Sequence, residues 1–388
     1  MSEPQGYVDP HFEPVREAFR ANFAERGELG AAVAVFVDGR AVADLWGGLA
    51  NHVQRTPWQR DTVTMIFSAT KGAVALCVHL LASRGELELD APVARYWPEF
   101  GAAGKAHIPV SALLNHQAGL AAIERQLPPE AIFEWPAITA ALAQQAPSWR
   151  PGTAHGYHAM TFGWLAGEVV RRVSGRTPGR LFRDEIAIPL GLDFWIGAPA
   201  EVEARFARVR MPPPSRHPNK LRAAMFQRDS LSGRAFLNPR SMMMPGQANS
   251  PEIHAAEIPA ANGLATARGL ARMYALLACG GRLDGVELVG RETLDRLAVA
   301  ESDGDDLVLL LPTRFTSGFM KHTDNRPESS FLLGPNDESF GHPGAGGAFG
   351  MADPVARVAI GYVMNQLGEG ILLNARGQAL IDAVYRCL

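Results

Sequence analysis

A long apolar stretch begins directly after Ser68 and continues through Leu81, with hydrophobic side chains on nearly every side of the helix that it predicts. A helix that is apolar all round belongs in a protein core. Gly85 marks the predicted end of this helix. Lys71 lies inside the stretch, although lysine is rarely buried unless it is paired. The pattern therefore predicts a buried helix that carries a serine and a lysine at its start.

The remaining hydrophobic pattern predicts further helices and short strands. Two apolar runs on either side of Asp38-Gly39 predict a hairpin over residues 31–46. Residues 86–194 have a mainly helical pattern that prolines interrupt. Further predicted elements are helices over 12–28, 161–173, 265–279 and 371–387, and strands over 316–321, 347–351 and 355–365.

This order of elements predicts a sheet built from both ends of the chain, with a helical region inserted between them. We expect an α/β lobe formed by residues 1–66 and 195–388. The mainly helical lobe then spans residues 67–194 and carries Ser68, Lys71 and Tyr157.

Residues 205–255 differ in character from the rest of the chain. They contain Pro212-Pro213-Pro214 and Met242-Met243-Met244-Pro245 and few periodic runs. A long segment of this kind inside a compact domain is usually a functional lid or a binding loop, and methionines favour an adaptable apolar wall. We therefore expect a lid-like segment over the site.

Composition narrows the classes of function. The chain has 388 residues, 47% of them hydrophobic and 20% charged, and a formal net charge of −3, which argues against non-specific binding of nucleic acid. Cys77, Cys279 and Cys387 lie far apart and show no metal-ligand spacing. The N-terminus has no secretory signal pattern, and no apolar stretch predicts a membrane span, so we expect a cytoplasmic protein.

Ser68-Ala69-Thr70-Lys71 is the strongest candidate for chemistry. Residues three apart share a helix face, so the Ser68 hydroxyl and the Lys71 amine are expected side by side. A serine hydroxyl needs a neighbour that takes its proton. A lysine in a dry pocket has a lowered pKa, which suits that role.

Two other segments suit the same chemistry. Tyr157 is expected on a loop before a helix, where a nearby ammonium would hold the phenol partly ionised as a proton shuttle; the alternative is a core tyrosine. The segment His342-Pro343-Gly344-Ala345 is rich in small residues that let a substrate approach, and its N–H groups can line an oxyanion hole. The alternative for His342 is a structural histidine.

The chain lacks the motifs of several other catalytic and ligand-binding sites. The chain has no G-x-S-x-G elbow and no H-E-x-x-H, and the glycines after His342 have the wrong spacing for a dinucleotide site. Asp303, Asp305 and Asp306 do not follow an EF-hand register, so we expect a solvated loop there. His116 lies in a segment that suggests only a helix cap and a turn.

Five motifs occur together in one order along the chain. They are Phe67–Lys71, Leu113–Leu120, Pro151-Gly152-Thr153 with Tyr157, Asn262-Gly263-Leu264, and His342-Pro343-Gly344. In residues and spacing the chain resembles the serine β-lactamase-related superfamily, which includes class C β-lactamases, D-alanyl-D-alanine carboxypeptidases and family VIII carboxylesterases. The resemblance implies an α/β fold of the α+β type: an antiparallel sheet flanked by helices, an inserted helical lobe, and the site in the cleft between.

The resemblance also implies roles for individual residues. Ser68 is the acylated nucleophile, and Lys71 and Tyr157 form the proton-transfer system. His342 and Gly344 lie on the strand edge that faces the substrate, and the backbone N–H groups of Ser68 and Ala345 form the oxyanion hole. Which of Lys71 and Tyr157 is the general base stays open. This chemistry requires no cofactor and no metal.

Two departures from the family pattern bear on the substrate. His342-Pro343-Gly344 stands where lactamases and carboxypeptidases have Lys-Thr-Gly, and a mostly neutral histidine binds a carboxylate less well than lysine does. Ala159 stands where the Tyr-x-Asn motif has its asparagine, which binds an amide. Both departures favour esters, as in the family VIII carboxylesterases.

The expected function is therefore a serine carboxylesterase that cleaves short-chain esters through an acyl-enzyme on Ser68. The alternatives with the same acyl-enzyme are a β-lactamase, a D-amino-acid peptidase or an acyltransferase. A non-catalytic relative that uses the site only for binding is the remaining class. The expected partner is a small ester, without nucleic acid or membrane.

Overall fold

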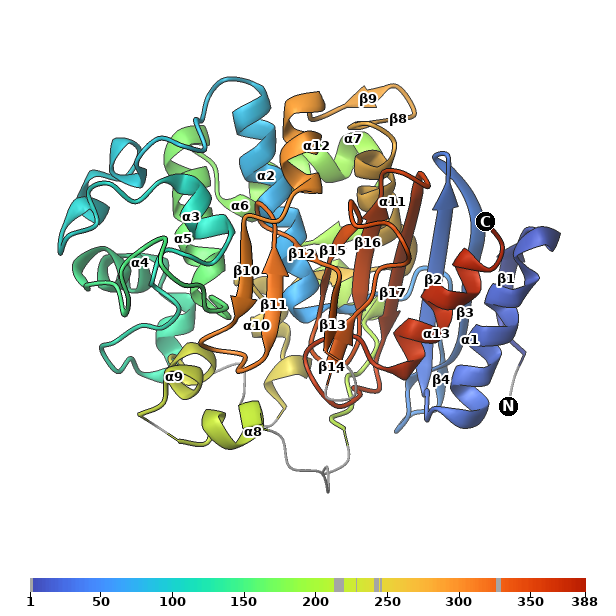
Figure 1. Cartoon of the computed structure of the whole chain (residues 1–388). Helices are drawn as coiled ribbons and strands as arrows, with labels where there is room; N and C mark the ends of the chain where they lie inside the picture. Colours follow the sequence, from blue (N-terminus) through green and yellow to red (C-terminus); the bar gives the residue numbers. More distant parts are fainter. Residues whose placement is uncertain (1–2, 213–219, 228, 241–243, 245, 326–328) are drawn as a thin grey trace.

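The computed structural model describes residues 3–212, 220–227, 229–240, 244, 246–325 and 329–388 (Figure 1). Within these residues the largest sheet has ten strands, and every pairing in it is antiparallel. Its main path runs in the order β1 (Gln5–Val8), β3 (Arg40–Asn51), β2 (Gly30–Val37), β17 (Val358–Met364), β16 (Phe349–Asp353), β15 (Phe340–Pro343), β12 (Met320–Lys321), β11 (Pro312–Phe315) and β10 (Ser302–Asp305), and β4 (Thr56–Pro57) pairs with β3.

Strands from the two ends of the chain meet at the centre of this sheet. β17 pairs with β2 over seven residues, with Ile360 opposite Val35, and both residues are fully buried. The predicted hairpin of β2 and β3 is confirmed: Asp38 and Gly39 have φ values of 49° and 74°. A two-residue turn with positive φ at both residues has a backbone twist that matches the right-handed twist of the strands it joins.

Helices cover both faces of the sheet. Successive side chains of a strand point to opposite faces. In β16, Phe349 contacts α13 (Ala375–Tyr385), where a Cβ on Gly377 would lie 3.1 Å from its ring. The next residue, Gly350, faces α11 (Ala267–Ala278), where a Cβ would lie 2.2 Å from the ring of Tyr274. α1 (Glu13–Glu25) lies beside α13 (Figure 1).

The inserted region is mainly helical, as predicted. Its helices are α2 (Lys71–Ser83), α3 (Val110–Leu114), α4 (Trp135–Gln144), α5 (Thr161–Ser174), α6 (Pro178–Phe182) and α7 (Ile188–Leu190). α5 ends at Gly175, which has a left-handed φ of 69°. A glycine at this position is a common helix stop.

Short elements complete the described chain. Three strands form a small sheet in the order β5 (Thr64–Met65), β7 (Leu264–Ala265) and β6 (Phe194–Trp195). Two hairpins pair β8 (Arg282–Leu283) with β9 (Val286–Glu287) and β13 (Thr323–Asn325) with β14 (Ser329–Phe331). The other helices are α8 (Lys220–Met225), α9 (Leu231–Leu237), α10 (Pro251–Ala255) and α12 (Arg291–Ala298).

Two predictions about local structure need correction. The strand predicted over 316–321 is the turn between β11 and β12 together with β12, because Thr316 and Gly318 bond within the turn. The solvated loop predicted at Asp303, Asp305 and Asp306 is right only in part: Asp303 and Asp305 are exposed, but they lie in β10 rather than in a loop, and Asp306 is 2% exposed. The carboxylate of Asp306 is buried because it accepts several N–H groups.

The expected lid at 205–255 is described only in part. Pro213, Pro214, Met242, Met243 and Pro245 lie outside the described residues. The described part of the segment contains α8, α9 and α10. That the segment covers the site stays a prediction.

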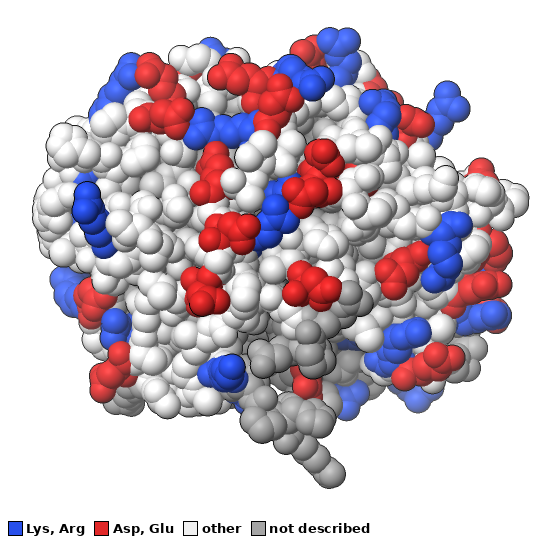
Figure 2. All heavy atoms as spheres, viewed as in Figure 1, with Lys and Arg blue, Asp and Glu red and all other residues white. Residues whose placement is uncertain are grey.

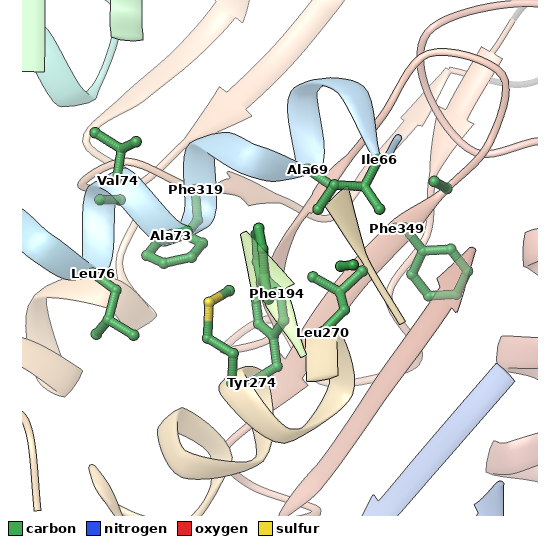
Figure 3. Close-up of a cluster of buried hydrophobic side chains, with 14 of the residues drawn as sticks. Ile66, Ala69, Ala73, Val74, Leu76, Phe194, Leu270, Tyr274, Phe319 and Phe349 are labelled. Carbon is green, nitrogen blue, oxygen red and sulfur yellow. The ribbon is translucent and has the colours of Figure 1, made fainter. Parts of the chain in front are cut away.

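The start of α2 packs in the core between the sheet and the helical region (Figure 3). Ala69 and Ala73 lie in one buried cluster with Phe194, Tyr274 and Phe319. Gly72 allows the close approach, because a Cβ there would lie 2.6 Å from the hydroxyl of Tyr274. The helix that begins with the serine and the lysine is therefore held on several sides.

The surface carries mixed charge. On the face shown in Figure 2, Lys and Arg side chains alternate with Asp and Glu side chains. This pattern agrees with the small net charge of −3. None of the helices in the described parts combines the length and the apolarity that a bilayer span needs.

Candidate active site

A strained turn presents Ser68. The preceding residue, Phe67, has a φ of 47°, in the left-handed region that a bulky side chain rarely adopts. Such a conformation costs about 1–3 kcal/mol and persists where the surroundings fix it. Phe67 opens a 3-10 turn, Phe67–Thr70, that leads into α2. Ser68 is partly exposed, whereas Ala69, Thr70 and Lys71 behind it are buried.

Hydrogen bonds with Gly263, the residue just before β7, hold this turn. Thr70 Oγ1 donates to the carbonyl of Phe67 at 2.6 Å and accepts from the N–H of Gly263 at 2.8 Å. The N–H of Ile66 donates to the carbonyl of Gly263 at 2.9 Å. A Cβ on Gly263 would lie 2.6 Å from Thr70 Oγ1. The Asn262-Gly263-Leu264 motif therefore acts as a support for the turn.

The edge of β15 lies against the other side of the turn. A Cβ on Gly344 would lie 2.1 Å from the carbonyl oxygen of Ile66, so only glycine fits there. The neighbouring Ala345 is partly exposed. The structure thus brings the His342-Pro343-Gly344 segment beside Ser68, as the sequence predicted.

Lys71 points into the space between the turn and the helical region. Its Nζ lies 2.8 Å from the carbonyl oxygen of Ala159, 2.9 Å from that of Ala260 and 3.2 Å from Ser68 Oγ. The side chain is fully buried. Burial lowers the pKa of Lys71 well below its ordinary value, because a dry surrounding disfavours the ammonium form.

Tyr157 lies next to this amine. Lys71 Nζ is 4.7 Å from the centre of the Tyr157 ring, and the Tyr157 hydroxyl interacts with the Ser68 side chain. Phe315 of β11 stacks on the same ring, with 6.0 Å between centroids and 11° between planes. Both carboxylate oxygens of Asp306 accept the Tyr157 N–H, at 3.0 and 3.1 Å.

The expected partial ionisation of Tyr157 is wrong in direction. Burial raises the pKa of its phenol; the interaction with Ser68 lowers it and the nearby Asp306 raises it further, and burial is the largest of the three effects. The tyrosine is therefore a neutral hydrogen-bond donor at ordinary pH.

The histidines around Tyr157 are neutral as well. Burial is the main cause of the lowered pKa of His116, and it lowers the pKa of His158 to about 3. The His116 Nδ1 accepts the N–H of His158 at 3.1 Å, and its ring packs against Tyr157 at 5.0 Å between centroids. His116 has a φ of 65°. It shapes the loop that carries Tyr157, in line with the expected structural role.

His342 provides an unpaired acceptor at the site. Burial, followed by the proximity of Lys71, lowers its pKa to about 3, so the ring is neutral. Nδ1 lies 2.7 Å from the carbonyl oxygen of Pro343, which can only accept a hydrogen bond. This contact places the ring hydrogen on Nδ1. Nε2 is then a lone-pair acceptor, buried without a partner among the described residues.

Sequence reasoning missed three polar groups of this site. Asp306 follows a short strand and gives no sequence signal of its contact with Tyr157. The carbonyls of Ala159 and Ala260 act through the backbone, which the side-chain type does not reveal. The position of Ala159 two residues after Tyr157 draws attention to its missing side chain, but not to its carbonyl, and Ala260 has no such signal.

Comparison with known proteins gives consistent results. The family described as Beta-lactamase matches residues 15–383. The esterase/beta-lactamase LipL of Mycobacterium tuberculosis is 39% identical over 377 residues, which cover 95% of this chain and 84% of that protein.

Two solved structures are similar over the whole length. A family VIII carboxylesterase is 38% identical with a TM-score of 0.89, and the match covers 100% of both chains. A penicillin-binding protein homologue from Caulobacter crescentus is 39% identical with a TM-score of 0.88, again over 100% of both chains.

Proposed function

The chain belongs to the beta-lactamase family and is a hydrolase of the serine β-lactamase/esterase fold, and from this premise we propose a serine carboxylesterase that cleaves short-chain esters. Ser68 is the nucleophile, Lys71 its general base, and Tyr157 the group that passes the proton to the leaving alcohol. The reaction proceeds through an acyl-enzyme on Ser68.

The environment of the Lys71 amine carries this proposal. A neutral amine has two N–H donors and one lone pair. The carbonyls of Ala159 and Ala260 can only accept, so they take the two hydrogens. The lone pair then faces the third neighbour, Ser68 Oγ, at 3.2 Å. The lowered pKa of Lys71 supports the neutral form.

The proposed relay follows from a neutral Lys71. The Ser68 hydroxyl, 3.2 Å from Lys71 Nζ, gives its hydrogen to the free lone pair of the amine, and the neutral Tyr157 phenol stands beside Ser68 as the proton donor for the alcohol. When Ser68 attacks the ester carbonyl, its proton moves to Lys71. Tyr157 then gives its proton to the departing alcohol oxygen and recovers one from the Lys71 ammonium.

Water completes the cycle. A water molecule attacks the acyl carbonyl, the relay accepts its proton, and Ser68 regains a proton as the acid departs. In both steps the negative oxygen is stabilised by backbone N–H groups, for which we propose Ser68 and Ala345. Fixed donors of this kind are often the largest single contribution to catalysis.

The neutral groups at the site favour an uncharged substrate. His342 carries no charge at ordinary pH and offers an acceptor, so a substrate carboxylate finds no cation at this position. Ala159 has no side-chain donor for a substrate amide. The carboxylesterase among the similar structures supports an ester.

A second activity with the same acyl-enzyme is favoured by the relatives. LipL is described as an esterase and a beta-lactamase, and a similar structure is a penicillin-binding protein homologue. A β-lactam, a D-amino-acid amide or an alcohol acceptor would use the same serine. The neutral His342 makes esters the better substrates.

A substrate panel tests the proposal. We expect p-nitrophenyl butyrate to be hydrolysed far faster than nitrocefin or a D-amino-acid amide. Replacement of the nucleophile, Ser68→Ala, should reduce kcat/KM by at least about 10³-fold. Ser68→Ala should also abolish labelling by a fluorophosphonate. Unchanged ester hydrolysis by Ser68→Ala would exclude the mechanism, and faster nitrocefin turnover would favour the β-lactamase alternative.

A further inference from the structure

A buried ion pair lies behind the turn that follows β15. Glu28 comes just before β2, and Arg376 lies in the first turn of α13. Arg376 Nη1 is 2.8 Å from Glu28 Oε1, and the two side chains are 5% and 0% exposed. The hydroxyl of Tyr362 donates to the other oxygen of Glu28. A buried pair of this kind adds little net stability compared with apolar packing. Stability alone therefore does not explain why Arg376 is buried here.

The second amino group of the guanidinium contacts two backbone carbonyls. Arg376 Nη2 lies 2.9 Å from the carbonyl oxygen of Gln366 and 3.4 Å from that of Gly346. Asn374 Nδ2 and the N–H of Gly368 also donate to the Gly346 oxygen, each at 2.9 Å. The planar guanidinium of arginine can donate hydrogen bonds to the carboxylate and to the carbonyls at the same time. One carbonyl in the turn is therefore fixed by several donors.

The turn itself has no side chain that could fix its shape. Gly346 and Gly347 have φ values of 85° and 110°, which glycine adopts without strain. A Cβ on Gly347 would lie 2.2 Å from Asn374 Nδ2. Hydrogen bonds to the backbone must therefore set the orientation of the peptide groups in this turn.

Two peptide planes connect Arg376 with Ala345. The carbonyl of Gly346 and the N–H of Gly347 belong to one planar peptide group and point in opposite directions. The Gly347 N–H donates to the carbonyl of Gly344 at 3.0 Å. That carbonyl shares its peptide group with the N–H of Ala345. Fixing the Gly346 carbonyl thus orients the Ala345 N–H.

We propose that Arg376, held in place by Glu28, is a positioning residue that aims the N–H of Ala345 at the substrate oxyanion. The inference rests on the proposed function, because it assumes that Ala345 supplies an oxyanion donor. Arg376 does not touch the substrate. It acts on the transition state, where the negative oxygen needs a donor about 2.7–3.1 Å away.

The substitution Arg376→Lys tests the proposal. Lysine keeps the charge opposite Glu28 but lacks the fork that also reaches the two carbonyls. Loss of a whole oxyanion donor costs about 10²–10³-fold in kcat, so a misaligned donor should cost about 10–100-fold. We expect KM for p-nitrophenyl butyrate to stay within about 2-fold, since ground-state binding depends less on this donor.

An inhibitor separates positioning from general damage. An alkyl trifluoromethyl ketone forms a tetrahedral adduct with an oxyanion at the same place. Its affinity for Arg376→Lys should fall in parallel with kcat/KM. A second variant, Glu28→Gln, should lower both quantities in the same direction by about 3–10-fold, because the amide holds the guanidinium less firmly.

Glu168 provides a matched control. Its side chain is 2% exposed and binds Arg171 and Arg172 on α5, away from the β15 turn. Glu168→Gln should lower the thermal midpoint without lowering kcat or inhibitor affinity at a temperature where the protein is folded. Unchanged kcat and inhibitor affinity in both Arg376→Lys and Glu28→Gln would overturn the inference, even if both variants were less stable. Loss of activity in Ser68→Ala alongside that result would leave the proposed function intact.

Discussion

Two regions of the molecule bury a lysine among backbone carbonyls, and only one of them has the geometry of a catalytic site. Lys71 and Lys105 are both fully buried. Lys105 Nζ lies 2.9 Å from the carbonyl oxygen of Ala102 and 3.0 Å from that of Ala143, and it also donates to the carbonyl of Gln145. Burial lowers the pKa of Lys105 as well, but three carbonyls can accept only from three hydrogens, so we expect an ammonium that ties loops together.

At Lys71 the third acceptor is replaced by the Ser68 hydroxyl. A hydroxyl can donate as well as accept, so the amine no longer needs a third hydrogen. Burial of a lysine is therefore not evidence for catalysis by itself, since Lys321 is also buried and donates to the carbonyl of Ala298. The third partner distinguishes a general base from a structural cation.

The largest expected effect separates these two lysines. Lys71→Met should reduce kcat/KM for p-nitrophenyl butyrate by at least about 10³-fold, because Ser68 loses its base. Lys105→Met should leave kcat/KM almost unchanged but lower the free energy of unfolding by about 2 kcal/mol or more, because buried carbonyls lose their donor. Steady-state kinetics and urea unfolding of both variants measure the difference. Equal losses of activity in the two variants would contradict the comparison.

Tyr157→Phe tests the relay beyond Lys71. The ring and its stacking on Phe315 remain, but the proton donor for the leaving alcohol is lost. We expect kcat to fall by about 10²-fold, within the usual range for a general acid. Esters with better leaving groups should lose less, since their alcohols need no proton. Equal losses for p-nitrophenyl and ethyl butyrate would argue against the assigned role.

His342→Lys places a new amine beside Lys71. The new cation would attract a substrate carboxylate and would also oppose charge on Lys71. We expect the ratio of nitrocefin to ester turnover to rise by about 10-fold, the size of roughly 1.4 kcal/mol of selectivity. His342→Gln, which is neutral, serves as the control and should leave the ratio near that of the wild type. A ratio that rises equally in both variants would refute the charge argument.

Much of this site could be predicted from the sequence, because its chemistry lies in side chains at helix and strand spacings. The Ser68–Lys71 pair, Tyr157 and Gly344 at the end of β15 come together as expected. The long apolar helix that follows Ser68 and begins with Lys71 is buried. The two carbonyls that bind Lys71 could not be predicted, since any residue provides a carbonyl and only the fold determines its direction.

Polar contacts between residues far apart in the chain could not be predicted from the sequence either. Asp306 looked like part of an acidic loop, yet it is buried because four N–H and hydroxyl donors surround it, from Tyr157, Val308, Leu309 and Thr313. The expected ionisation of Tyr157 is wrong in direction because burial of the phenol disfavours its charged form and raises its pKa. Burial at a loop depends on the packing of distant strands, which local sequence does not specify.

The last expected effect concerns stability rather than turnover, and it is a dependence of the free energy of unfolding on pH. The pKa of Lys71 is lower in the folded state than its ordinary value, so between the two values the unfolded chain binds one more proton. Stability conferred by this group therefore rises with pH in that window, by up to about 1.4 kcal/mol per pH unit. Comparison of wild type with Lys71→Met between pH 7 and 9 should show the wild type gaining relative stability as pH rises. A constant difference would mean that Lys71 titrates normally.

The most direct measurement is the ionisation state of Lys71 itself. The side-chain nitrogens of a protein labelled with ¹⁵Nζ-lysine can be observed by NMR at neutral pH, with Lys71→Met and Lys105→Met used for assignment. We predict a neutral amine signal for Lys71 and an ammonium signal for Lys105 in the same spectrum. An ammonium signal for Lys71 in the free enzyme would contradict its assignment as the general base.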